Sequence, residues 1–384
     1  MRAARSFAAA ATICAGLLLP SVAHGAPLQF FAESAPTSAS YDGTGATPLV
    51  GDFNGDGNDD LFLYRPGAAT ETVKWGQNSR TFSTSTAATY QVKGTYQPLV
   101  GDFDGNGVTD IFWYAPGPAA DTLWAFHPGG SKTVVPKTVN GTFKPIVGDF
   151  VREAGDPDGA LDIFWYAPGT AADSLWEATG GSHFHAIPQT VNGSFTPLVG
   201  GFTPKTGSAY GGSVDLSVDI FWYAPGKAAD SLWNGHNDGT WTKIPKTVNG
   251  TYKPFVGLFD GYGVDDIFWY SSSGADSVWL GDPDTGAQDA FGASIGSGYT
   301  PVVGSFLIPD EPIYWYSPTG PDDFWLPQGA PGTWDYSTLA NNTDMGPGYQ
   351  PQTGDFDGDG HNDIYWLRQG TGSERMFWGP NPDA

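Results

Sequence analysis

The loop GDFDGDGHND at residues 354–363 gathers carboxylates at a spacing that suits a metal ion. Positions 1, 3, 5 and 9 of this loop are Asp355, Asp357, Asp359 and Asp363. Alternating side chains on a tight loop converge on one point, and the backbone carbonyl of His361 at position 7 can point there too. Hard oxygen ligands in this number suit Ca²⁺, whereas Mg²⁺ keeps fewer protein ligands and more water.

Two other loops repeat the pattern in full. The predicted ligands of the first are Asp52, Asn54, Asp56, the carbonyl of Asn58, and Asp60. Those of the second are Asp102, Asp104, Asn106, the carbonyl of Val108, and Asp110. Because the same oxygen ligands recur at the same spacing, we expect Ca²⁺ in both loops.

A further loop carries an insertion, VREAG, but regains the acidic spacing afterwards. Its predicted ligands are Asp149, Asp156, Asp158, the carbonyl of Ala160, and Asp162. Three remaining loops have Gly201, Leu258 or Ser305 in the first position, which breaks the carboxylate set. We therefore expect about four structural Ca²⁺ ions, in the loops that begin at residues 52, 102, 149 and 355.

The acidic loops belong to a unit that occurs seven times along the chain. The unit reads x-P-L-V-G-D-F, the loop, D-I-F-W-Y-A-P-G and then A-D-S-L-W, and its first loop position recurs every 47 to 57 residues. Repeats of this length indicate a solenoid, a propeller or an array. Independent beads are excluded, because no linker separates the copies and each is too small to bury its own core.

Each unit reads as four short strands. PLVGDF, DIFWYAP and ADSLW supply three of them, and a Thr/Val-rich stretch such as 184–191 supplies the fourth. The many Gly and Pro residues (54 and 31) and an aromatic content of 15% favour short strands separated by turns. Seven four-stranded units predict an all-β, seven-bladed β-propeller with blades starting near residues 46, 96, 143, 195, 252, 299 and 349.

The last unit lacks a fourth strand, because the chain ends six residues after ERMFW (374–378). The segment LQFFAES (28–34) precedes the first blade and has no blade of its own. We expect this N-terminal segment to complete the last blade. Closing the ring in this way hides its edge strands.

An acidic loop that ends in an aspartate and leads into a strand resembles the calcium loop of FG-GAP (VCBS-type) repeats, which form the blades of integrin-α-like propellers. The resemblance extends from about residue 28 to the end of the chain. It implies that Ca²⁺ staples the hairpins at a distance from the face that binds ligands.

The first 25 residues are predicted to be a secretory signal peptide. Arg2 and Arg5 precede an apolar run from residue 7 to 19, and Ala23-His24-Gly25 suits cleavage. The mature protein is then a single secreted propeller over residues 26–384. The only cysteine, Cys14, lies in the removed segment, so no disulfide is expected.

The net charge of −24 becomes −26 once the two signal-peptide arginines are removed, since no acid leaves with them. This charge argues against nucleic acid and anionic membrane surfaces as partners. The apolar run is also too short for a membrane span.

The rim opposite the acidic loops repeats an acid shortly before a tryptophan. The pairs are Asp121 with Trp124, Asp173 with Trp176, Asp230 with Trp233, Asp276 with Trp279, Asp322 with Trp325, and the variants Glu71 with Trp75 and Glu374 with Trp378. An aromatic ring can stack on a pyranose while a carboxylate accepts hydrogen bonds from the sugar hydroxyls. Several such sites that bind one ligand together raise the overall affinity by avidity. Some fungal and bacterial seven-bladed lectins resemble this layout. The alternative is that the acid binds turn amides and the tryptophan packs between blades.

Motifs for catalysis are weak. GASIG (292–296) matches G-x-S-x-G without a strand-turn-helix context, and His183 and His185 alternate on one predicted strand without a third ligand. We therefore predict a binding module, with multivalent carbohydrate recognition as the first function. The alternatives are adhesion to a cell-surface or extracellular protein, and a polysaccharide-degrading enzyme.

Overall fold

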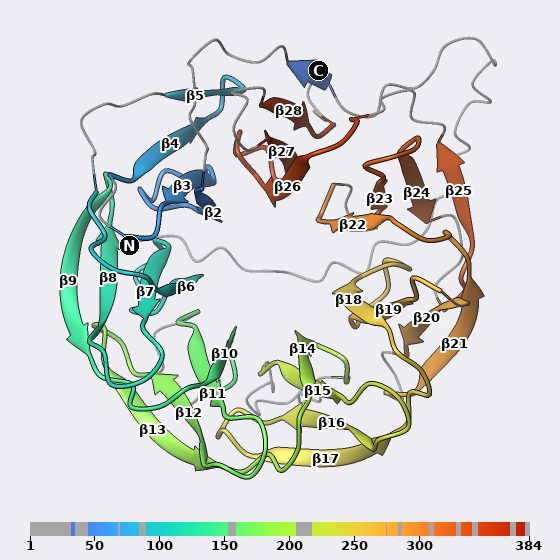
Figure 1. The fold of residues 1–384 in the computed structure, drawn as a ribbon, viewed down its shortest axis with the longest axis horizontal. Helices are drawn as coiled ribbons and strands as arrows, with labels where there is room; N and C mark the ends of the chain where they lie inside the picture. The colour runs from blue at the N-terminus through green and yellow to red at the C-terminus, as the bar shows by residue number, and fades with distance from the viewer. Residues whose placement is uncertain are drawn as a thin grey trace, which may run out of the picture.

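The computed structural model is a ring of seven antiparallel sheets with four strands each (Figure 1). It describes residues 32–34, 45–67, 70–83, 90–152, 159–204, 217–273, 275–282, 286–306, 311–327, 332–339, 345–368 and 374–380. All regular elements in this part of the chain are strands, so the predicted all-β, seven-bladed fold is confirmed. The predicted signal peptide, residues 1–25, lies outside the described residues.

Each blade places its strands in chain order from the centre of the ring to its perimeter, and the last blade takes β1 as its outer strand. The inner strands are β2 (Thr47–Gly51), β6 (Gln97–Gly101), β10 (Lys144–Gly148), β14 (Thr196–Gly200), β18 (Lys253–Gly257), β22 (Thr300–Val303) and β26 (Tyr349–Gly354). The second strands are β3 (Asp60–Tyr64), β7 (Asp110–Tyr114), β11 (Asp162–Tyr166), β15 (Asp219–Tyr223), β19 (Asp266–Tyr270), β23 (Ile313–Tyr316) and β27 (Asp363–Arg368). The third strands are β4 (Thr72–Gln77), β8 (Asp121–His127), β12 (Asp173–Ala178), β16 (Asp230–Gly235), β20 (Asp276–Gly281), β24 (Asp323–Pro327) and β28 (Arg375–Trp378). The outer strands are β5 (Thr81–Ser83), β9 (Ser131–Lys137), β13 (Phe184–Gln189), β17 (Trp241–Lys246), β21 (Gln288–Ala293), β25 (Tyr336–Leu339) and β1 (Ala32–Ser34).

Burial along a blade explains why these sequences form these strands. The D-I-F-W-Y strands are buried at every position because a neighbouring blade covers each face, and β-branched and aromatic residues fit such a strand. The outer strands are largely exposed, and Pro136, Pro188 and Pro245 stand in three of them. Proline donates no hydrogen bond, so it protects these edges from pairing with other chains.

Aromatic side chains fill the space between neighbouring blades. Trp113 of blade two packs against Tyr64 and Phe62 of blade one, with ring centroids 4.8 and 5.9 Å apart. The same contact recurs around the ring, for example between Trp165 and Tyr114. The core of the protein is therefore a set of inter-blade clusters.

The ring closes between blades seven and one. β1 pairs antiparallel with β28, with Ala32 opposite Trp378 and Ser34 opposite Met376. Three residues of the segment predicted for this role, 28–34, lie in the strand, and the rest lie outside the described residues. The inner strands β2 and β26 also lie side by side.

Candidate functional site: the acidic loops and the opposite rim

The loop between β6 and β7 is shaped by its first aspartate. The Asp102 carboxylate accepts hydrogen bonds from the backbone N–H groups of Gly105, Asn106 and Gly107, at 2.7 to 3.2 Å. Gly105 and Gly107 have φ of 75° and 82°, a conformation that glycine adopts without steric cost. Asp52 and Asp355 hold their loops in the same way.

The aspartate at loop position 9 joins the loop to the third strand. Asp110 accepts from Phe103 N–H in the loop and from Phe126 N–H on β8, at 3.0 and 2.7 Å. Asp266 accepts from the corresponding N–H groups of Phe259 and Gly281, and Asp219 accepts from the Thr203 hydroxyl and Gly235 N–H, although both loops have lost the first aspartate. This aspartate therefore stabilises the blade whether or not its loop suits a metal.

Carboxylates converge in two loops. Oxygen atoms of Asp102, Asp104 and Asp110 lie within 4.8 Å of one another, and so do those of Asp355, Asp357 and Asp363. Burial raises the pKa of Asp110 and of Asp363 to about 8, and neighbouring loop carboxylates add to the effect. A divalent cation would offset this repulsion, so both oxygen clusters fit a metal ion.

The loop of blade one is arranged differently. The Asp56 carboxylate accepts from both the backbone and the side-chain N–H of Asn58, at 2.9 and 2.8 Å. Asp52, Asp56 and Asp60 do not form a close carboxylate group in the described structure. Asn54 can still supply an amide oxygen, so the predicted ligand set keeps its residue types.

In the acidic loop of blade three, an arginine side chain places its positive charge beside the predicted first calcium ligand. The guanidinium of Arg152 forms an ion pair with Asp149, the predicted first ligand. Sequence reasoning overlooked this arginine, although it lies within the VREAG insertion. Asp156 and Asp158 lie outside the described residues, and Asp162 accepts backbone amides of residues 150, 151 and 178.

The loops of neighbouring blades are linked by a closed ring of seven hydrogen bonds, which we call the inter-loop ring. In each, the N–H before a second strand donates to the carbonyl of the first loop residue in the preceding blade. The pairs are Thr109 with Asp52, Leu161 with Asp102, Val218 with Asp149, Asp265 with Gly201, Glu311 with Leu258, Asn362 with Ser305, and Asp59 with Asp355. Their N···O distances run from 2.7 to 3.2 Å.

In four blades, a side chain of the next blade accepts the N–H of the first loop residue. Side chains of Asp265, Glu311 and Asn362 accept the N–H of Gly201, Leu258 and Ser305, at 2.7 to 2.9 Å. Asp59 accepts the N–H of Asp355 in the same way, at 2.9 Å, although blade seven keeps its first aspartate. Burial, together with the nearby Asp355 and Asp52 carboxylates, raises the pKa of Asp59 to about 6. The sequence signal was the residue one or two places before the second strand, which is acidic or an amide in all four of these cases.

The acids of the opposite rim bind the turns. Asp121 accepts from Ala115 N–H and Val139 N–H, both at 2.7 Å, and so ties the turn between β7 and β8 to the link between blades. Asp173, Asp230, Asp276 and Asp322 make corresponding pairs of bonds. These carboxylates are at most 5% exposed, so they cannot serve as sugar acceptors on an open face. The structure therefore fits the alternative in which the acid binds turn amides, and not the one in which it binds sugar hydroxyls.

The tryptophans that follow these acids pack between blades. The ring centroids of Trp113 and Trp124 are 5.2 Å apart in an edge-to-face contact. The same contact joins Trp176, Trp233, Trp279 and Trp325 to the second-strand tryptophan of their own blades. Blades one and seven differ from the expected acid–tryptophan pairs. The strand register places Lys74 of blade one and Phe377 of blade seven at the position of Trp124. The predicted Trp75 and Trp378 each lie one residue further along the strand.

Comparison with known proteins agrees with this architecture. Residues 52–113, which span the acidic loops of blades one and two, match the family model described as FG-GAP-like repeat. Residues 52–113 of this propeller therefore carry an FG-GAP-like repeat. A search of curated proteins finds no match.

Solved structures resemble this chain at low sequence identity. A lectin of Agrocybe aegerita, described as recognising non-reducing terminal N-acetylglucosamine, is 15% identical with a TM-score of 0.55, covering 80% of this chain and 83% of its own. BBS1N in complex with ARL6DN is 10% identical with a TM-score of 0.49, covering 92% and 97%. The Vibrio cholerae biofilm matrix protein Bap1 is 11% identical with a TM-score of 0.32, covering 88% and 77%.

The FG-GAP-like repeat propeller presents a second recurrent group on the rim opposite its acidic loops. We call Tyr96, Phe143, Phe195 and Tyr252 the aromatic rim. Each ring lies over a glycine two residues earlier, where a Cβ would come within 2.8 Å of it. Each is half-buried, so part of the ring meets solvent.

The backbone beneath the aromatic rim is rigid. Gly117 and Gly141 exchange N–H···O bonds of 2.7 and 3.4 Å, and Phe143 N–H donates to the Tyr114 hydroxyl at 2.9 Å. Corresponding glycine pairs occur in blades one, three and four. The repeat therefore builds the same platform under four partly exposed rings.

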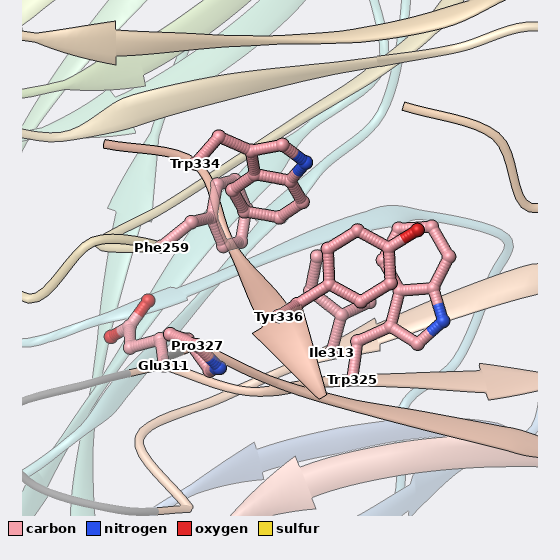
Figure 2. Close-up of a pocket in the computed structure, with 7 residues that line it drawn as sticks. All are labelled: Phe259, Glu311, Ile313, Trp325, Pro327, Trp334 and Tyr336. Atoms are coloured by element: carbon pink, nitrogen blue, oxygen red, sulfur yellow. The ribbon is translucent and has the colours of Figure 1, made fainter. Parts of the chain in front are cut away.

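A narrow gap without room for a water molecule lies between blades five and six (Figure 2). It is lined by Phe259, Glu311, Ile313, Trp325, Pro327, Trp334 and Tyr336. The rings of Trp325 and Tyr336 stack with centroids 4.0 Å apart, and Glu311 lies at the other end of the pocket in Figure 2. Both Glu311 oxygens accept hydrogen bonds within the fold. A gap too narrow for water is far smaller than a ligand pocket, so it reflects only the packing of the rings around it.

The catalytic motifs find no supporting geometry among the described residues. Gly292 and Ala293 of GASIG end the outer strand β21, and no helix follows them. His185 pairs with Glu177 at 2.9 Å, while His183 contacts the Gly180 carbonyl. In the part of the chain that the structure describes, no helix has the length and apolar character needed to cross a bilayer.

Proposed function

We propose that this protein is a secreted, Ca²⁺-stabilised binding module that recognises carbohydrate at several equivalent points on the aromatic rim. The observation that carries the proposal is the recurrence of one partly exposed ring on one rigid backbone platform in four consecutive blades. A repeated weak site gains affinity when a branched or polymeric ligand engages several copies.

The chemistry of the aromatic rim suits a sugar. Tyrosine and phenylalanine rings offer an apolar face to a pyranose, and Asn140, Asn192 and Asn249 are exposed three residues before three of the rings. Amide groups both donate to and accept from hydroxyl groups. The lectin from Agrocybe aegerita shares the fold, and its described ligand is a sugar.

The metal part of the proposal rests on the acidic loops of blades two and seven. Asp102, Asp104 and Asp110 would hold one ion, with Asn106 and the carbonyl of Val108 as further oxygen donors. Asp355, Asp357 and Asp363 would hold another, with Asp359 and the carbonyl of His361, and the Arg80 guanidinium also pairs with Asp357 and Asp359 in this loop. Blade one keeps the ligand types for a third ion. In blade three, the Arg152 guanidinium takes the place of the metal charge.

Glycan-array binding in saturating Ca²⁺ tests the carbohydrate proposal. We expect binding to a defined glycan class, and a loss of about tenfold or more in the combined variant Tyr96→Ala/Phe143→Ala/Phe195→Ala/Tyr252→Ala, because several weak contacts act together. Tyr262→Ala is the matched control, because this tyrosine is 43% exposed but lies in an acidic loop on the opposite rim.

Three results would count against carbohydrate recognition at this rim. One is a clean array with a folded, Ca²⁺-saturated protein. Another is equal loss in the Tyr262→Ala control. The third is release of new reducing ends or unsaturated products from polysaccharides, which would indicate an enzyme. Capture of an extracellular protein by a sample that gives a clean array would favour adhesion.

A further inference from the structure

The contact surface between blades seven and one differs from the other six inter-blade surfaces. We call it the closing seam. Two residues of blade one depart from the repeat there. By strand register, Leu63 holds the position of Trp113, and Lys74 holds that of Trp124. Leu63 packs in a cluster with side chains of blade seven, so the departures lie on the face that the last blade meets.

Lys74 makes polar contacts where the other seams have aromatic ones. Its Nζ donates to Glu374 Oε2 at 2.6 Å and to the Tyr365 hydroxyl at 2.8 Å. The Lys74 and Glu374 side chains are only 9% and 12% exposed. A buried ion pair therefore replaces the tryptophan contacts of the repeat.

Glu374 comes from a position that has another role elsewhere. The register aligns it with Asp121, whose carboxylate binds the turn amides of blade two. In blade seven, this acid instead pairs with a lysine of the neighbouring blade. Both partners of the ion pair thus depart from the pattern of the other blades.

Arg80 is a third residue of blade one that contacts blade seven, and its left-handed backbone conformation is costly for a residue with a side chain. It stands at the turn position of Gly130, and both residues have a left-handed backbone, with φ of 59° and 76°. Its guanidinium contacts Asp357 at 2.7 Å and Asp359 at 3.2 Å, in the acidic loop of blade seven. The contacts across the seam hold the Arg80 side chain at a turn position where blades two, four and five have glycine and blade three has Ser182, with φ of 65°.

Buried charges discriminate between partners more than they stabilise. A buried ion pair adds little net stability, but a buried charge without its partner is costly. The other blades also carry an acid at the position of Glu374, but it binds turn amides, as Asp121 does. Phenylalanine stands at the position of Tyr365 in blades one to five, and in blade six the Tyr314 hydroxyl donates to Asp322, so a docked face from another blade would lack a carboxylate that is available to Lys74. Blade seven offers Glu374, Tyr365 and the two loop aspartates at the matching places.

We propose that the closing seam is a docking surface whose charged residues select the face of blade seven over the aromatic faces of the other blades. The partner it fits is thus the last blade of the same chain. This surface fixes the number of blades in the ring. Near-identical aromatic faces would otherwise allow closure after fewer blades, or association of open chains.

Refolding of two seam variants tests the proposal. Leu63→Trp/Lys74→Trp restores the aromatic face of the repeat, and Lys74→Met/Glu374→Gln removes both charges. After dilution from denaturant, we expect oligomers and misassembled species to be at least about fivefold more abundant than in wild type, measured by size exclusion with light scattering. Monomer yields equal to wild type for both variants would overturn the proposal.

Thermal unfolding of the native proteins supplies a second test that does not depend on refolding. Lys74→Met and Glu374→Gln should each lower Tm by roughly 5 °C, and the double variant should regain most of this loss. Lys243→Met is the control, because this lysine lies over the Trp233 ring at 3.6 Å and forms no ion pair with an acid among the residues that the structure describes. Wild-type Tm in all three seam variants would also overturn the proposal.

Discussion

At the scale of single residues, a carboxylate has a different role according to its place in the loop. Asp110 and its counterparts at position 9 join loop and strand in blades with and without a convergent carboxylate group. Position 3 discriminates better, since Asp104 contributes to a cluster while Asp260 binds only backbone amides. A substitution at position 3 should therefore affect metal binding more selectively than one at position 9, which would also break the link between loop and strand.

Asp104→Ala should remove one Ca²⁺ from the stoichiometry, or weaken one site by about tenfold or more, because it deletes a charged ligand. Isothermal titration calorimetry measures both quantities. Asp260→Ala is the matched control and should leave the stoichiometry unchanged. An equal effect of the two variants would contradict the assignment of the cluster in blade two.

At the scale of the element, blades two to six each depend on an acid that joins the second turn of the blade to the next blade. Asp121→Ala leaves two buried amides, those of Ala115 and Val139, without an acceptor. We expect a loss of about 2–4 kcal/mol in the free energy of unfolding, measured by urea denaturation. Asp289→Ala on the exposed outer strand β21 should change it by less than about 0.5 kcal/mol. Similar losses in the two variants would contradict the structural role of Asp121.

The elements could be predicted from the sequence because the repeat displays them seven times. Strand order, blade number and loop positions follow from the spacing of D-I-F-W-Y and the acidic loops. The role of the rim acids could not be decided, because the sequence does not show that Ala115 N–H and Val139 N–H lie on either side of Asp121. Lys74 was also overlooked, since only strand register reveals that it replaces a tryptophan.

At the scale of the whole molecule, the buried acids link stability to pH and to metal. Burial raises the pKa of Asp60, Asp110, Asp266 and Asp363 to about 8 and that of Asp162 to about 7. The folded state thus holds protons that the unfolded chain releases near pH 4. Protons favour the folded state in this window, so stability falls as the pH rises from about 4 to about 8.

In the presence of a chelator, we therefore expect Tm to drop by at least about 5 °C between pH 5 and pH 8, measured by differential scanning calorimetry. Saturating Ca²⁺ should flatten most of this slope, because the ion pairs with the ionised carboxylates. Some slope should persist, since Asp266 belongs to a loop without a carboxylate cluster. A Tm that rises with pH in the chelator would contradict the prediction.

The inter-loop ring gives the molecule a form of redundancy. Each loop donates to one neighbour and accepts from the other, so the circle of hydrogen bonds has a direction and no end member. A break at one link leaves six links that still hold every blade from at least one side. Local fraying at a single blade is thereby contained, and concerted loss of the circle requires at least two breaks.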